Sequence, residues 1–225
     1  MNLPIIVVNF KAYVESTGMK SIKIAKIAEE VSKETGIEIA VAPSFADVVK
    51  VKELVSIPVF AQHADNISPG GHTGSITVEN LKDWNIDGVI INHSEKQLKI
   101  SEIDALIKKI SDLGMKSIAC TNNVSVTRAV SALSPDFVAI EPPELIGGDI
   151  SVSMAKPEVI QDSVKVVKMI DKNVTVLCGA GVKNKNDVKR AYELGAMGIL
   201  VASGVVKAKD VKSALMDLAS GFAGD

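Results

Sequence analysis

The sequence predicts an α/β protein with the architecture of a (β/α)₈ barrel, built as a single domain from residues 1–225. Three observations lead to this fold: eight short apolar runs, helical periodicity between them, and a length near the roughly 250 residues such a barrel typically needs. A doubly wound open sheet is the rival architecture. That sheet usually has fewer strands, and its first strand is usually followed by a G-x-G-x-x-G motif, which this chain lacks.

The eight apolar runs are short, rich in β-branched residues and apolar at consecutive positions. Strands of a parallel sheet that is buried on both faces have this character. In a barrel, the active site lies at the carboxyl ends of the strands, so these ends are where functional residues are expected. The predicted strands are residues 5–8, 37–42, 57–61, 88–91, 116–120, 137–140, 174–178 and 198–202.

The segments between the runs show the periodicity of amphipathic helices. In the first of them, one face is apolar and lysines and glutamates occupy most of the other, and similar stretches lie around residues 106–113, 126–133, 159–170, 188–194 and 211–218. No low-complexity linker divides the chain. The apolar face of the first predicted helix consists of Ile22, Ile24, Ala25, Ile27, Ala28 and Val31.

Composition excludes several classes of function. The formal net charge of −2 argues against nucleic acid or a membrane surface as the main partner. No apolar run approaches the roughly 20 residues of a spanning helix, and the N-terminus lacks signal-peptide features, so we expect a cytoplasmic protein. Cys120 and Cys178 then read as buried, reduced thiols, with a disulfide or a nucleophile as the alternative. No Cys/His spacing indicates a metal site, and no cofactor is expected.

Polar residues and glycines gather at the ends of five predicted strands. Each group alone is weak evidence for an active site, because a helix cap or a turn also explains it. All five groups would, however, meet at one rim of a barrel. The five segments are Asn9-Phe10-Lys11, Asn92-His93-Ser94-Glu95, Glu141, Cys178-Gly179-Ala180-Gly181 and Ala202-Ser203-Gly204.

Glu141 is the most informative of these residues. It ends an apolar run and precedes Pro142-Pro143, which should hold the backbone extended at this point. A long loop with a glycine tip follows, and long loops in compact domains are often active-site lids. We therefore expect a carboxylate base that works beneath a lid.

The remaining groups supply complementary chemistry. The turns at Gly181 and at Ser203-Gly204 follow strands seven and eight, where barrels commonly bind phosphate through backbone N–H groups. Lys11 offers a positive charge that Glu95 could pair with, and His93 is expected near a helix N-terminus, which disfavours a positive imidazolium. Together these groups predict proton transfer beside a carbonyl of a phosphorylated substrate.

The five segments, together with Glu141-Pro142-Pro143-Glu144-Leu145-Ile146-Gly147, resemble the triosephosphate isomerase family, and the lid and short chain resemble its archaeal branch. The resemblance covers the whole chain, with the motifs in the same order. It implies a TIM barrel that interconverts D-glyceraldehyde 3-phosphate and dihydroxyacetone phosphate through an enediolate without a cofactor. This activity belongs to glycolysis and gluconeogenesis.

The resemblance also implies the role of each site residue. Glu141 would be the base, His93 the neutral electrophile, Lys11 the electrostatic stabiliser of the enediolate, and Glu95 the partner that orients Lys11. Asn9 and Phe10 would help to bind substrate. Backbone N–H groups would hold the phosphate at Ile146, Gly147, Gly181, Ala202 and Ser203.

A homo-oligomer is a further implication, as a dimer or a tetramer. Residues 62–75 resemble the loop that inserts into a neighbouring subunit in this family, and His63 and His72 read as structural or interface residues. Many relatives carry a glutamate at the position of Ser75 and two arginines at Lys96-Gln97, so the interface here differs in detail.

Other phosphate-binding barrels remain as alternatives. A Schiff-base aldolase would need a lysine at the end of strand six, where Glu141 stands. A metal-dependent epimerase would need several clustered His and carboxylate ligands. A catalytically inactive sugar-phosphate binder should lack Lys11, His93 or Glu141, and all three are present.

Overall fold

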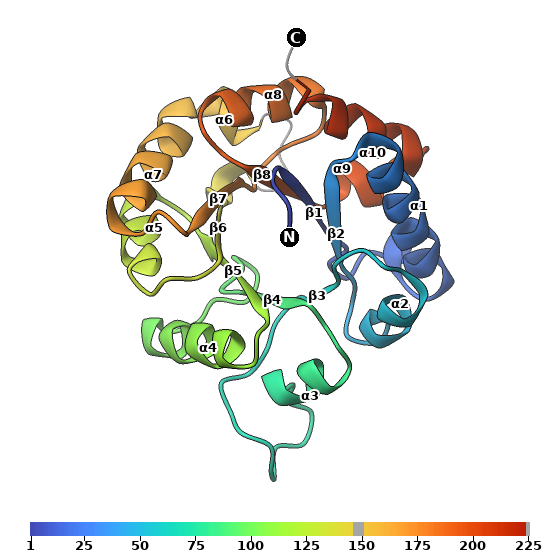
Figure 1. Ribbon diagram of the computed structural model, residues 1–225, viewed down its shortest axis with the longest axis vertical. Helices are drawn as coiled ribbons and strands as arrows, with labels where there is room; N and C mark the ends of the chain where they lie inside the picture. Colours follow the sequence, from blue (N-terminus) through green and yellow to red (C-terminus); the bar gives the residue numbers. More distant parts are fainter. Residues whose placement is uncertain (146–150, 224–225) are drawn as a thin grey trace.

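The structure is a computed structural model that describes residues 1–145 and 151–223. Within these residues, eight parallel strands form a barrel and helices surround it, as Figure 1 shows. The predicted (β/α)₈ fold is therefore confirmed. The strands are β1 (Ile5–Asn9), β2 (Glu38–Ala42), β3 (Phe60–Ala61), β4 (Gly88–Ile91), β5 (Lys116–Thr121), β6 (Phe137–Ile140), β7 (Thr175–Cys178) and β8 (Gly198–Val201).

The strand order around the barrel is β2-β1-β8-β7-β6-β5-β4-β3. The ring closes between β2 and β3 through a single parallel bridge that pairs Val41 with Val59, next to a hydrogen bond from Val41 N to the carbonyl oxygen of Pro58. Pro58 has no N–H group to continue this ladder, so β3 is shorter than the run 57–61 that the sequence predicted.

Helices form the outer layer. Those predicted from periodicity are present, and the sequence pattern missed α2, α3, α6 and α9, each of which has seven residues or fewer. So short a helix spans too few turns to show a periodic pattern. The helices are α1 (Met19–Thr35), α2 (Val48–Leu54), α3 (Val78–Asp83), α4 (Ile100–Asp112), α5 (Val124–Ser131), α6 (Val152–Ala155), α7 (Pro157–Ile170), α8 (Lys185–Glu193), α9 (Ser203–Val206) and α10 (Val211–Ser220), with 3-10 turns η1 (Val14–Ser16) and η2 (Pro143–Leu145).

The hydrophobic core has two parts, because successive side chains of a strand point to opposite faces of the sheet. In β1, Ile5 and Val7 belong to one buried cluster, which also holds Phe60, Ile118 and other inward-facing residues. Ile6 and Val8 belong to the other, which packs against the helices. This double burial explains why the strands are apolar at consecutive positions.

Candidate active site

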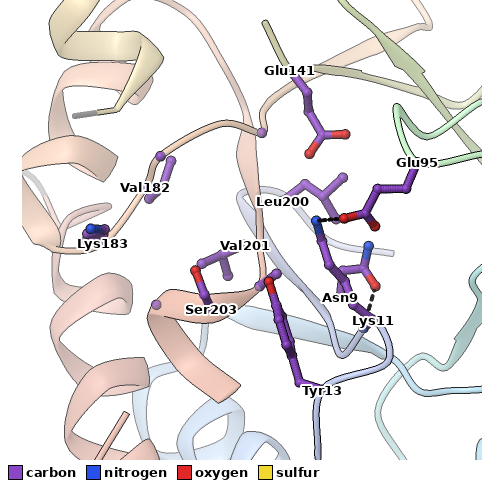
Figure 2. A pocket seen from close by; sticks show the side chains of 14 residues that line it. Asn9, Lys11, Tyr13, Glu95, Glu141, Val182, Lys183, Leu200, Val201 and Ser203 are labelled. Carbon is purple, nitrogen blue, oxygen red and sulfur yellow. Dashed lines mark hydrogen bonds and ion pairs between the residues drawn. The ribbon is translucent and has the colours of Figure 1, made fainter. Parts of the chain in front are cut away.

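A cavity of about 190 Å³ opens at the carboxyl ends of the strands. Its lining combines residues of β1 and β8 with residues of the turns that follow β1, β4, β6, β7 and β8, and Figure 2 shows these side chains converging. Of the residues predicted from the sequence, those that line the cavity are Asn9, Lys11, Glu95, Glu141, Gly181, Ala202 and Ser203.

Lys11 is held in an uncommon backbone conformation just beyond β1. Its φ of 48° lies in the left-handed region, which non-glycine residues rarely occupy and which tends to occur at functional sites. Its N–H donates to Asn9 Oδ1 at 3.0 Å, and Gln62 Nε2 donates to its carbonyl oxygen at 3.0 Å. These bonds position the side chain, whose Nζ lies 2.9 Å from Glu95 Oε1. Lys11 is thus largely buried, with its charge paired at the cavity.

His93 and Glu141 lie close together just beyond the carboxyl ends of β4 and β6, and Glu141, but not His93, is among the residues that line the cavity. The two side chains are 6% and 5% exposed, and His93 Nε2 lies 3.4 Å from Glu141 Oε2. Neither of these two atoms has a hydrogen-bond partner among the described residues. Buried polar atoms are nearly always hydrogen-bonded, so these two unpartnered atoms are an exception, and a catalytic role is one explanation for such exceptions.

The other nitrogen of His93 decides the tautomer. The backbone N–H of Glu95 donates to His93 Nδ1 at 3.2 Å, so Nδ1 acts as an acceptor. In the neutral ring, the proton is then on Nε2, which faces Glu141. This arrangement also corrects one expectation from the sequence. We expected His93 near a helix N-terminus, but residues 94 and 95 form a turn and α4 begins only at Ile100. The Glu95 N–H group therefore contacts the ring at Nδ1, and Glu95 Oε2 lies 3.5 Å from the same nitrogen.

Glu141 is positioned by its neighbours on both sides. Its N–H donates to the carbonyl oxygen of Thr121 at 2.8 Å, and the chain then enters η2 after Pro142. Gly179, at the end of β7, packs directly against the carboxylate side chain. A Cβ atom at Gly179 would lie 2.4 Å from Glu141 Cγ. The position therefore requires glycine because of this close approach.

Glu141 also contributes to a second cavity of about 480 Å³, on the side of β5, α4 and α5. This cavity is larger than the first, but its lining is mostly apolar and amide side chains, including Leu98, Ile100 and Val126. Lys11 and the glycine turns after β7 and β8 line only the smaller cavity. The smaller cavity is therefore the candidate active site, because it combines the charged and anion-binding groups.

The glycine-containing turns after β7 and β8 form one side of the smaller cavity. Gly181, with φ of 71°, lies in the first turn, and α9 begins at Ser203 in the second. Backbone N–H groups in such turns bind anions in many barrels. Figure 2 shows Val182 and Ser203 on this side, opposite the Lys11–Glu95 pair. The predicted phosphate contacts at Ile146 and Gly147 lie outside the described residues.

His93 is not among the residues that line either cavity beside Glu141, and neither is Phe10. The Phe10 side chain is fully buried in the hydrophobic core. Three residues with a clear place in the site were missed by sequence reasoning. Gln62 braces Lys11, Gly179 contacts Glu141, and Tyr13 lines the cavity while Lys207 Nζ sits 4.1 Å from the centre of its ring. Gly179 belongs to the motif Cys178-Gly179-Ala180-Gly181, but the sequence alone does not show that this residue packs closely against Glu141.

The two cysteines are buried and unpaired. Burial raises the pKa of the Cys120 thiol well above its usual value, and the Glu141 carboxylate raises it further. Burial likewise raises the pKa of Cys178 to about 12. Thiols held in the protonated form are poor nucleophiles. The structure therefore agrees with the inert, reduced thiols that the sequence predicted.

Two further observations concern the described residues. Across residues 1–145 and 151–223, no group of three or more His, Cys, Asp or Glu side chains is arranged to hold a metal ion. Of the helices in that part of the chain, none combines the length and apolar character needed to cross a bilayer.

Comparison with known proteins gives a consistent result. A sequence model described as triosephosphate isomerase matches residues 4–219. The chain is 55% identical over 214 residues to the triosephosphate isomerase of Methanocaldococcus jannaschii, which covers 95% of this chain and 98% of that protein. It is 54% identical over 218 residues to the triosephosphate isomerase of Methanothermus fervidus, covering 97% and 98%. The enzyme of Methanobrevibacter smithii is 49% identical over 220 residues, covering 98% and 99%.

Proposed function

The chain belongs to the triosephosphate isomerase family, and we propose that Glu141, His93 and Lys11 carry out its reaction in the cavity at the strand ends. The reaction is the interconversion of D-glyceraldehyde 3-phosphate and dihydroxyacetone phosphate, an aldose–ketose isomerisation. One observation carries the assignment of residues. His93 Nε2 and Glu141 Oε2 are buried and 3.4 Å apart, and neither has a partner among the described residues.

In this proposal Glu141 is the base. It removes a proton from one carbon of the substrate and returns it to the neighbouring carbon, so that an enediolate forms and collapses. His93, neutral and protonated on Nε2, polarises the carbonyl oxygen and moves a proton between the two substrate oxygens. The donation from Glu95 N–H to Nδ1 supports this tautomer.

Lys11 stabilises the negative charge that develops on the enediolate. Its side chain is only 12% exposed, and in such surroundings a charge interaction is less screened than in water. Glu95 orients Lys11 through the 2.9 Å ion pair, and Asn9 holds the strained backbone of Lys11. The phosphate group binds at Gly181, Ala202 and Ser203, together with Ile146 and Gly147 from outside the described residues.

We also propose that the protein is a homo-oligomer, a dimer or a tetramer. Residues 68–75 are all exposed, and the segment between β3 and α3 reaches beyond the ring of helices in Figure 1. A hydrogen bond joins the two ends of this loop, since Asp65 Oδ2 accepts the N–H of Ile76 at 2.7 Å. Sedimentation equilibrium tests the proposal, since a monomer at all concentrations would contradict it. The buried, unpaired thiols support a reducing, cytoplasmic location.

The experiment that tests the catalytic assignment compares the wild type with Glu141→Gln and with a surface control, Glu193→Gln. Because general base catalysis typically contributes 10²–10⁴-fold, we expect Glu141→Gln to lower kcat by about a thousandfold. The affinity for inorganic phosphate should stay nearly the same, since the amide keeps the shape of the site. Glu193→Gln should behave like the wild type. A Glu141→Gln enzyme that retains wild-type kcat would refute the assignment.

A further inference from the structure

A cluster of buried polar side chains lies next to the phosphate end of the site. Ser151, Ser153 and Asp187 are 1%, 0% and 7% exposed. Ser151 Oγ donates to Asp187 Oδ1 at 2.7 Å, and Ser153 Oγ donates to the carbonyl oxygen of Asp187 at 3.0 Å. The cluster thus joins the start of α6, where the described chain resumes after Leu145, to the first turn of α8.

The second carboxylate oxygen of Asp187 holds the turn that follows β7. Oδ2 accepts the N–H of Lys183 at 2.9 Å and the N–H of Asn184 at 3.2 Å. This turn begins at Gly181, and Gly181 and Lys183 line the active-site cavity. A nearly buried carboxylate is costly unless hydrogen bonds compensate it, and here both oxygens are used. The geometry of the turn therefore depends directly on Asp187.

A helix cap alone does not account for these contacts. Asp187 forms a capping box with Asn184 at the start of α8, which needs only the bond from Asn184 N to Oδ2. The bond from Ser151 to Oδ1 is additional and reaches 36 residues back along the chain. Ser151 itself occupies the N-cap position of α6, yet it makes no capping hydrogen bond there. Its hydroxyl is directed to Asp187 instead.

A backbone contact runs alongside the side-chain bonds. Val152 N donates to the carbonyl oxygen of Ala180 at 3.0 Å, one residue before Gly181. The start of α6 is therefore hydrogen-bonded to Ala180, in the turn after β7, and to Asp187. A change in the Asp187 carboxylate should therefore affect both the turn after β7 and the start of α6, because both are hydrogen-bonded to Asp187.

We propose that Asp187 is a positioning residue for the phosphate end of the site. It holds the turn of residues 181–184 and, through Ser151, the segment that follows the Glu141 loop as one unit, so that the phosphate of the substrate meets preformed N–H groups. This inference rests on the proposed function, since it assigns phosphate to this turn.

The test uses Asp187→Asn, Ser151→Ala and the double variant in the full-length protein. The amide keeps the shape of the carboxylate but loses the charge and one of two acceptor oxygens, and charge-assisted hydrogen bonds are about twice as strong as neutral ones. We expect Asp187→Asn to raise KM, and the dissociation constant of inorganic phosphate measured by NMR titration, by about tenfold, with kcat changed less than about threefold. Ser151→Ala should raise both by about threefold. The double variant should not exceed Asp187→Asn, because Ser151 acts on the turn through its bond to Asp187.

Asp136→Asn and Ser117→Ala are the matched controls. Asp136 also accepts a backbone N–H and a serine hydroxyl, both from Ser117, but it lies at the amino end of β6, opposite the active site. These controls should lower the unfolding temperature without changing KM or phosphate affinity.

The inference is overturned if Asp187→Asn lowers only the unfolding temperature, or if the effects of the two variants simply add. If Asp187→Asn does not fold, the Ser151→Ala variant tests the inference instead, because it leaves the α8 capping box intact. A raised KM and weaker phosphate binding in Ser151→Ala would support the inference. Wild-type values of both would overturn it. Failure of the proposed function looks different. In that case the wild type would not isomerise triose phosphates, or Glu141→Gln would retain wild-type kcat.

Discussion

Replacing Gly179 by alanine tests whether catalysis depends on the position of the Glu141 carboxylate. The added Cβ would lie 2.4 Å from Glu141 Cγ, 3.1 Å from Glu141 Cδ and 3.1 Å from the carbonyl oxygen of Ile140. The backbone of Gly179 is not in the left-handed region, so alanine is allowed there and the effect is purely steric. Because Ile140 is fixed in β6, the Glu141 side chain has to move.

The size of the effect follows from the distance. An ordinary contact begins at 3.4 Å, so the Glu141 side chain must retreat by about 1 Å. A misplacement of about 1 Å in a catalytic group can cost about a hundredfold in rate, or about 2.7 kcal/mol of activation free energy. Overpacking should also lower the free energy of unfolding by about 1–3 kcal/mol.

The assay is kcat and KM for isomerisation, with circular dichroism and thermal unfolding to confirm that the variant is folded. Glu193→Gln serves again as the control, because Glu193 lies on α8 and is not among the residues that line the cavity. We expect kcat to fall about a hundredfold in Gly179→Ala and to stay unchanged in Glu193→Gln. A folded Gly179→Ala enzyme with kcat within about threefold of wild type would refute this account of Glu141.

Three further predictions follow from single contacts. Glu95→Gln removes the charged partner of Lys11 and should lower kcat/KM by about tenfold. The free energy of unfolding should change little, because the Glu95 side chain is 60% exposed. An unchanged kcat/KM would contradict the role of the Lys11–Glu95 pair. Gln62→Ala leaves the Lys11 carbonyl oxygen without its side-chain donor. Urea denaturation should then show a loss of about 1–2 kcal/mol in the free energy of unfolding, and kcat should be lower. Wild-type values of both would exclude a role for Gln62 in positioning Lys11. Burial lowers the pKa of His63 despite the opposing influence of Asp65. The unfolded chain therefore binds the proton more tightly than the folded protein, and the free energy of unfolding should fall as the pH drops below 6.5. His63→Gln should reduce that fall in thermal scans between about pH 7 and pH 5, and an identical pH profile would disprove it.

The strands and longer helices could be predicted because their patterns are local. A parallel strand buried on both faces must be apolar at consecutive positions, and β1, β4, β6 and β8 match their predicted runs within one residue at each end. The shortest elements could not be predicted in this way. In β3, the strand depends on what Val59 and Pro58 meet across the barrel, and the apolar run alone does not contain that information.

The environment of His93 shows a second reason why the sequence could not predict every part of the site. A histidine followed by Ser94 and Glu95 is a reasonable start for a helix, because serine and glutamate favour helix N-termini. The chain instead makes a turn there, in which Asn92 Oδ1 accepts the N–H of Leu98 at 2.9 Å and Asn92 Nδ2 donates to the carbonyl oxygen of Cys120 at 2.9 Å. The second contact is with another strand, so local propensity could not reveal it.

By itself, the sequence determined the barrel, the rim at which chemistry takes place, and the residue types gathered there, because hydrophobic periodicity and strand-end motifs are properties of neighbouring residues. Only the tertiary structure decided that Gly179 makes room for Glu141, that Gln62 braces Lys11, and that Asp187 joins Ser151 to the β7 turn. Each of these is a contact between residues at least 36 positions apart. Such contacts exist only after the strands close into a barrel and bring distant loops to one rim.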